Sequence, residues 1–217
     1  MWSCSLWALL PPVYSVFTAA GLWLVVAGNS PPASCIFSEV MNLAAFVGFI
    51  IAVLRYLQLK HVMDKQWLNF GSMVVLSFAC FGMTLVGNFQ VFTEEMIHNL
   101  GTFMTFGLGT LFCWVQSYIT LRVNLKNEGR KAGVLRFLLS GCITVSMILH
   151  FSLIAQRLHM QAAQCQWALV MFFLTFLSTF GIEFRHNRFE MVCSEHSGCP
   201  VSRSETSEVS RYQPDQL

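Results

Sequence analysis

Polar side chains that could attract a cation gather around one short segment between two apolar stretches. Glu39 and Asn42 lie three positions apart and would share one face of a helix. The candidate residues for an outer polar vestibule are Glu39, Asn42, Asn88, Gln90, Glu94, Glu95 and His98. Their oxygen atoms could attract cations to the outer opening of a pore. The same groups could instead cap the helix ends of an ordinary hydrated hairpin. The residues alone favour the hairpin.

Basic side chains form a second group, after the fourth long apolar stretch. The residues are Arg122, Lys126, Arg130, Lys131 and Arg136. Near a membrane surface each would attract anionic headgroups, phosphoinositides among them, by about 1 kcal/mol. The orientation of the chain would place basic residues here even without bound lipid, so both interpretations stay open.

Two of the eight cysteines lie where an oxidising compartment could join them. Cys35 and Cys165 are predicted at the non-cytosolic ends of their helices, and a disulfide between them is expected. Two free apolar thiols are the alternative. Cys193 and Cys199 follow the last apolar stretch, a juxtamembrane position that fits palmitoylation as well as unmodified thiols.

The other ionisable groups give no sign of catalysis or metal binding. The sequence has no nucleotide-binding loop, nucleophile elbow, zinc-type spacing or paired carboxylates. His150 lies deep in an apolar stretch without a second ligand on its helix, so we expect a neutral His hydrogen-bonded to a neighbouring helix. We expect no enzyme activity, cofactor or metal. The formal charge of +2 is too small to indicate a surface that binds nucleic acid.

These side chains must be positioned by helices inside a membrane. Hydrophobic residues make up 55% of the chain, charged residues only 11%, and the mean hydropathy is +0.57. A hydrocarbon core of about 30 Å needs about 20 apolar residues in a helix. Stretches of that length predict an all-α polytopic membrane protein with about six transmembrane helices in one bundle, within residues 1–184. They lie at 7–27, 36–57, 67–88, 98–121, 135–156 and 166–184.

The distribution of positive charge predicts how the bundle is oriented. Of the 13 Lys and Arg residues, all but Arg157 lie in or beside the second and fourth connections or in the C-terminal segment. The positive-inside rule makes that side cytoplasmic, so both termini are expected in the cytoplasm. Residues 185–217 are rich in Ser, Arg and Glu, and this composition predicts a disordered cytoplasmic tail.

Small residues recur every four positions on the fourth predicted span. Gly101, Thr105 and Gly109 form a pattern that lets helix backbones approach closely in lipid. The pattern predicts helix packing, either within the chain or by self-association with a second copy.

Several short motifs, in their order and spacing, resemble one family of membrane proteins. They are Pro31-Pro32-Ala33-Ser34-Cys35, Gly87-Asn88-Phe89-Gln90, Gln166-Trp167 and Glu183-Phe184. The chain resembles the six-span family of damage-regulated autophagy modulators, Frag and Sfk proteins, in its transmembrane protein 150 branch and there the tentonin-like members. Compared with those members the first outer loop is shortened, because Val25-Val26-Ala27-Gly28-Asn29 runs almost directly into Pro31.

The resemblance implies a component or modulator of a mechanosensitive, slowly inactivating cation conductance at the plasma membrane. Since the inner halves of the spans offer few polar groups for a pore, we expect action on a stretch-activated channel or on the surrounding membrane lipids rather than conduction. The alternative that the family implies is a non-channel scaffold that regulates phosphoinositide-kinase recruitment, or autophagy at endolysosomal membranes.

Overall fold

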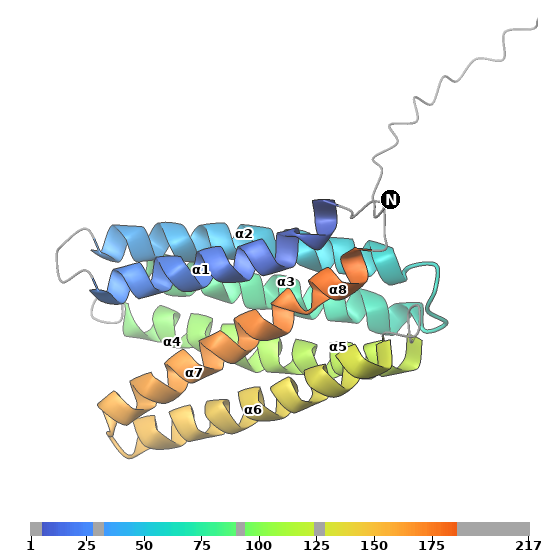
Figure 1. Ribbon diagram of the computed structural model, residues 1–217. Helices are drawn as coiled ribbons and strands as arrows, with labels where there is room; N and C mark the ends of the chain where they lie inside the picture. Colours follow the sequence, from blue (N-terminus) through green and yellow to red (C-terminus); the bar gives the residue numbers. More distant parts are fainter. Residues whose placement is uncertain (1–5, 28–32, 90–93, 124–128, 186–217) are drawn as a thin grey trace, which may run out of the picture.

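The structure is a computed structural model that describes residues 6–27, 33–89, 94–123 and 129–185. Nearly all of these residues are helical, and the helices run lengthwise in one bundle (Figure 1). The elements are η1 (Leu6–Ala8), α1 (Leu10–Ala27), α2 (Ala33–Leu59), α3 (Gln66–Asn88), α4 (Glu95–Phe103), η2 (Met104–Leu108), α5 (Gly109–Val123), α6 (Gly129–Ala155), α7 (His159–Ser178) and α8 (Phe180–Phe184). The expected fold class, an all-α polytopic membrane protein, is confirmed.

Helices occupy each of the six ranges that the apolar stretches predict. Within the described ranges, four helical segments are long and apolar enough to cross a membrane: Cys35–Leu59, Gln66–Asn88, Arg130–Ala155 and His159–Phe184. Helix α1 is apolar but shorter. The fourth predicted span corresponds to α4, η2 and α5 in succession. The number of crossings and the cytoplasmic side stay predictions, and the tail from 186 lies outside the described residues.

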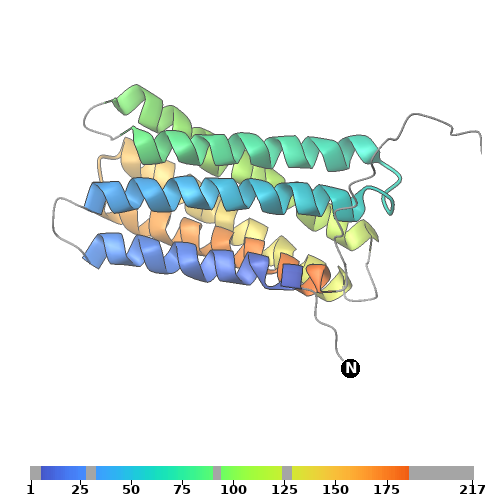
Figure 2. The same ribbon diagram turned by 90° about the horizontal axis from the view of Figure 1, so that it is seen from above.

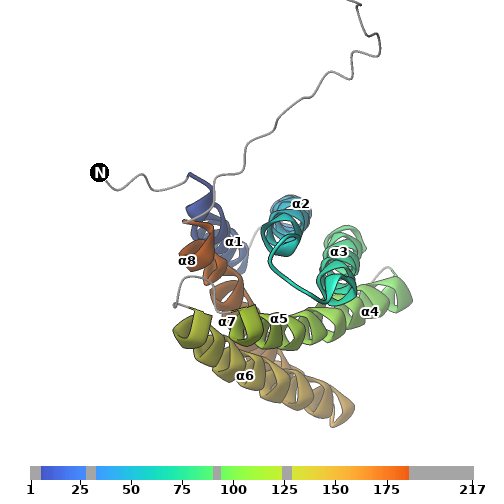
Figure 3. The same cartoon turned by 90° about the vertical axis from the view of Figure 1, so that its right-hand side faces the viewer.

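Helices that follow one another in the chain pack side by side, and the last helix returns to the first. Contacts join α1 to α2, α2 to α3, α3 to α4, η2 and α5, α5 to α6, and α6 to α7, while α7 also packs on α1. Seen from above and along the bundle, η1 and α8 lie together at one end (Figures 2 and 3). This closure brings the C-terminal helix onto the ends of α2, α5 and α6.

The surface and the core of the bundle show the distribution expected in lipid. Large apolar side chains such as Val16, Phe46 and Leu138 point outward and are more than half exposed, as a hydrocarbon solvent allows. Inside, the rings of Phe112, Phe176 and Phe180 pack edge to face, with centroids 5.9 to 6.3 Å apart.

Small residues bring α3 and α4 into close contact. A Cβ at Gly101 would lie 2.9 Å from the carbonyl oxygen of Gly82, and a Cβ at Gly82 would lie 2.8 Å from that of Gly101. Thr105 donates to the carbonyl of Gly101 at 2.8 Å, and Gly109 faces the ring of Phe173 on α7. The small-residue pattern therefore lies at helix contacts within the chain; self-association stays untested.

His150 contacts a neighbouring helix, as expected. Its Nδ1 lies 2.9 Å from the carbonyl oxygen of Ala162 on α7, and the ring is buried. Among the described residues, no group of three or more potential metal ligands comes together. The contact joins α6 to α7 beside the tight turn at Arg157, which has a positive φ of 60°.

Candidate functional site

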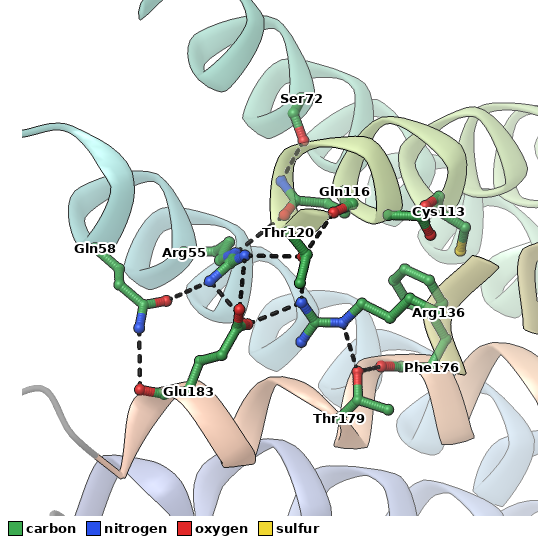
Figure 4. A network of polar contacts seen from close by, with 11 residues as sticks. Arg55, Gln58, Ser72, Cys113, Gln116, Thr120, Arg136, Phe176, Thr179 and Glu183 are labelled. Carbon is green, nitrogen blue, oxygen red and sulfur yellow. Dashed lines mark hydrogen bonds and ion pairs between the residues drawn. The ribbon is translucent and has the colours of Figure 1, made fainter. Parts of the chain in front are cut away.

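Three charged side chains meet inside the bundle, at the end where η1 and α8 lie. Arg55 comes from α2, Arg136 from α6 and Glu183 from α8 (Figure 4). Oxygen Oε2 of Glu183 lies 2.9 Å from Nη1 of Arg55 and 2.8 Å from Nη1 of Arg136. No more than 2% of any of the three side chains is exposed. The carboxylate thus bridges two guanidinium groups that are out of reach of bulk water.

Neutral polar side chains complete the hydrogen bonding of Arg55. Its Nε donates to Gln116 at 3.0 Å and its Nη1 donates to Gln58 at 2.6 Å. The amide of Gln58 donates to the backbone carbonyl of Glu183 at 3.1 Å, and that of Gln116 donates to Ser72 on α3 at 2.7 Å. Figure 4 shows these contacts converging from four helices. Removing one partner would disturb the packing of several helices.

Threonine hydroxyls and an aromatic ring surround Arg136. Its Nε donates to Thr179 at 2.8 Å and its Nη1 donates to Thr120, which also accepts from Arg55 at 3.3 Å. The Arg136 guanidinium lies 4.2 Å from the ring centroid of Phe180, a cation–π distance. Its Nη2 is buried and has no hydrogen-bond partner among the described residues.

The cluster holds two positive charges and one negative charge. This imbalance determines how much stability is lost when each residue is removed. Loss of one partner from a buried ion pair leaves an uncompensated charge, at a cost of about 3–5 kcal/mol. Without Glu183, both Arg55 and Arg136 would be unpaired, whereas loss of one arginine leaves a neutral pair. The arrangement ties α2, α5, α6 and α8 together and can act as a structural lock; nothing in it resembles catalytic machinery.

This arrangement corrects the expectation for Arg136. Arg136 was assigned to a lipid-facing basic loop, but its side chain is fully buried because it pairs with Glu183 inside the bundle. Glu183 lies at the end of the last predicted span and is buried for the same reason. Arg55 was not singled out at all. The signal for it was the presence of arginines and of carboxylates such as Glu183 in apolar spans, since such charges usually pair in the bundle interior.

Three other residues of the predicted basic loop lie on the surface, where headgroups could reach them. Arg122, Arg130 and Lys131 are exposed at the same end of the bundle as the ion-pair cluster. Arg122 also donates to the hydroxyl of Tyr118 at 3.1 Å. Lys126 lies outside the described residues. The binding of headgroups by this segment stays a prediction.

The predicted vestibule is brought together only in part. The side-chain amides of Asn42 and Asn88 donate to each other at 3.0 and 3.2 Å, and Ser38 also donates to Asn88 at 2.9 Å. His98 Nδ1 lies 2.7 Å from the carbonyl of Phe89. The carboxylates of Glu39, Glu94 and Glu95 are exposed, and Gln90 lies outside the described residues. The amides join α2 to α3, and attraction of cations stays untested.

The structure contradicts the predicted disulfide. Cys35 and Cys165 are both free thiols, one exposed and one half-buried. They lie on α2 and α7, and each of these helices packs on α1. The compartment rule predicts which side of the membrane a thiol faces but not how close two thiols lie, and these two are unpaired. The palmitoylation candidates Cys193 and Cys199 lie outside the described residues.

Comparison with known proteins places these observations in a family context. The family described as the Frag1/DRAM/Sfk1/Cwh43P N-terminal domain matches residues 26–187. That range contains the ion-pair cluster, the paired asparagines and all of the helices from α2 to α8.

Individual relatives match over most of the chain. It is similar to the modulator of macroautophagy TMEM150B of Danio rerio, with 29% identity over 94% of this chain and 96% of the relative. The TMEM150B protein of Xenopus tropicalis is 29% identical over 86% of this chain and 88% of its own length. Transmembrane protein 150A of Xenopus laevis is 31% identical over 72% of this chain and 59% of its own length. No solved structure matches the chain.

Proposed function

Because the chain belongs to the Frag1/DRAM/Sfk1 family of membrane proteins, we propose that it is a non-channel membrane modulator of autophagy. The relatives named as modulators of macroautophagy support this proposal. The names of the reported relatives favour the autophagy alternative over the expected mechanosensitive conductance, since none of them describes a channel.

The observation that carries the non-channel part is the buried ion-pair cluster. A conducting path needs groups that water can reach along its length. At this end of the bundle, Arg55, Arg136 and Glu183 fill the interior and are almost wholly buried. Charges that satisfy one another in a dry interior hold helices together and would obstruct a path for cations.

We infer that the chain acts through its cytoplasmic face at endolysosomal or plasma membranes. Exposed basic residues at that face, Arg130 and Lys131, would attract anionic headgroups and concentrate phosphoinositides beside the protein. A rigid bundle with a basic face suits a scaffold that recruits lipid-modifying or autophagy proteins. The buried cluster would keep α2, α5, α6 and α8 in the arrangement that presents this face.

The test measures autophagic flux in cells from which the chain has been removed. Flux is read as turnover of a lipidated autophagosome marker with and without a lysosomal inhibitor. We expect removal to change flux and the unaltered chain to restore it. The double variant Arg130→Gln, Lys131→Gln should restore it less well, whereas Arg157→Gln, at the opposite end of the bundle, should restore it fully. Unchanged flux after removal would contradict the autophagy role.

A second measurement addresses conduction separately. The purified chain is reconstituted in liposomes and tension is applied to a membrane patch. We expect no unitary currents. Tension-activated cation currents in the absence of any other channel would refute the non-channel part and restore the conductance hypothesis.

A further inference from the structure

A cavity of about 260 Å³ lies inside the bundle, in the half that holds the paired asparagines. It is larger than the apolar cavity of about 150 Å³ that accommodates one benzene molecule in an engineered protein. Side chains from α1, α2, α3, α4, η2 and α7 line it. They include Tyr14, Thr18, Phe37, Met83, Gln166 and Phe173.

The hydroxyl of Thr18 is the first sign that this cavity holds a ligand. Thr18 is 2% exposed, and its Oγ1 has no hydrogen-bond partner among the described residues. Helical threonines elsewhere satisfy this group locally: Thr102 and Thr105, which also line the cavity, donate to the carbonyls four residues earlier at 2.9 and 2.8 Å. Burying a hydroxyl without a hydrogen-bond partner costs free energy. A polar group of a ligand in the cavity would supply the partner that the Thr18 hydroxyl lacks.

Tyr14 lies one helical turn away from Thr18. Residues four apart share a helix face, and Tyr14 and Thr18 both line the cavity from α1. The Tyr14 side chain is 5% exposed, and its hydroxyl lies beside Gly48, where the thiol of Cys80 also approaches. Tyr14 therefore contributes its ring to the wall, and Thr18 supplies the unpaired hydroxyl.

The rest of the lining defines the chemistry of the occupant. No lining residue carries a charge, so a carboxylate, a phosphate or an ammonium group would lose its hydration without compensation. Aromatic and methionine side chains, among them Phe37, Phe173 and Met83, provide apolar contact. On α7 the amide of Gln166 lines the cavity beside Trp167, whose ring lies 5.4 Å from that of Trp23 on α1.

The wall of the cavity contains an irregular helical turn. Segment η2 is a π-helix, and its residues Thr105 and Phe106 line the cavity. Such widened turns are frequent at functional sites. The irregular backbone of η2 and the unpaired hydroxyl of Thr18 on α1 thus lie at the same uncharged cavity.

We propose that this cavity binds the hydroxyl-bearing end of a neutral lipid with a single hydroxyl group, with the hydroxyl bonded to Thr18 and the adjoining apolar atoms held by the aromatic and methionine side chains. Sterols and diacylglycerols both have this chemistry, and the experiment distinguishes them. The inference is independent of the role in autophagy, because it rests on the cavity alone.

The test uses the full chain purified in detergent and three photoactivatable probes: a sterol, a diacylglycerol and a fatty acid. We expect at least one of the two neutral probes to label α1 or α7, and excess unlabelled lipid of the same kind to prevent this. The probe that labels identifies the source. Equal labelling by the fatty acid, or no saturable labelling by either neutral probe, would overturn the proposal.

Matched variants connect the labelling to the unpaired hydroxyl of Thr18. Thr18→Val keeps the shape of the side chain and should weaken labelling about three- to tenfold, the effect of one hydrogen bond. Thr110→Val removes a buried hydroxyl that is already bonded to the carbonyl of Phe106 and does not line the cavity, so labelling should not change. Filling the cavity with Val170→Phe should abolish labelling. Undiminished labelling of both Thr18→Val and Val170→Phe would place the ligand elsewhere.

Discussion

The Arg136 guanidinium and the Glu183 carboxylate approach to 2.8 Å, and no more than 2% of either side chain is exposed. Neither charge can be stabilised by water at this depth, so each depends on the other and on Arg55, whose Nη1 lies 2.9 Å from the same carboxylate oxygen. The stability of the bundle should therefore respond to the balance of charge in the cluster more than to the presence of any one residue.

The variant Glu183→Gln should destabilise the protein by about 3–5 kcal/mol, because it leaves two buried guanidinium groups unpaired. Thermal unfolding in detergent, followed by size-exclusion chromatography, measures the effect. Glu95→Gln is the matched control, since Glu95 is exposed in the first turn of α4. Equal stability of the two variants would mean that the carboxylate of Glu183 is not buried.

Loss of Arg136 should cost less than loss of Glu183. Arg136→Met leaves the neutral pair of Arg55 and Glu183 and removes an Nη2 that has no hydrogen-bond partner. The double variant Glu183→Gln, Arg136→Met should then be more stable than Glu183→Gln alone, because it contains one unpaired charge instead of two. A double variant that is less stable than either single variant would rule out this charge-balance account.

The sequence predicted the helices well because apolar stretches of span length have few other solutions in lipid. Hydropathy could not predict the break at Thr179 between α7 and α8 or the π-helix η2. Both features depend on contacts between helices: Thr179 accepts a hydrogen bond from Arg136 of α6, and η2 packs on α3.

The candidate site was much harder to predict. Arg55, Arg136 and Glu183 each lie near a span end, where a charge could equally reach water. Only the return of α7 and α8 to the first helices brings them together. The pairing of Asn42 with Asn88 was easier to anticipate, because α2 and α3 are consecutive helices and the two residues lie at the same end of the bundle.

Gly101→Ala should destabilise the bundle by about 1–3 kcal/mol, the usual cost of overpacking. The added Cβ would lie 2.9 Å from the backbone oxygen of Gly82, which cannot move aside as a flexible side chain would. Gly71→Ala is the control, because nothing lies within 4 Å of its Cβ position. There alanine should be neutral or stabilising in the helix. The comparison is made by unfolding of both variants in the same detergent.

Cys35 should react with a membrane-impermeant maleimide added to intact cells without a reductant. The thiol is free and exposed, and the positive-inside rule places this end of α2 outside the cytoplasm. Mass tagging of wild type and Cys35→Ser measures the reaction. Modification only after reduction would restore a disulfide at this position. Modification only after permeabilisation would mean either that the topology is inverted or that the chain lies in an endolysosomal membrane.

Exposed basic residues should enrich anionic lipid around the protein, whereas buried basic residues should not. Arg130→Gln with Lys131→Gln should reduce the enrichment of a fluorescent phosphoinositide around the protein in proteoliposomes, by about 1 kcal/mol for each charge. The enrichment lost should be greatest at low salt, where exposed charges are least screened. Arg136→Met should leave the enrichment unchanged, because the Arg136 side chain is wholly buried and has its charge compensated by Glu183. An equal loss of enrichment in folded Arg136→Met protein would show that this arginine reaches the headgroups after all.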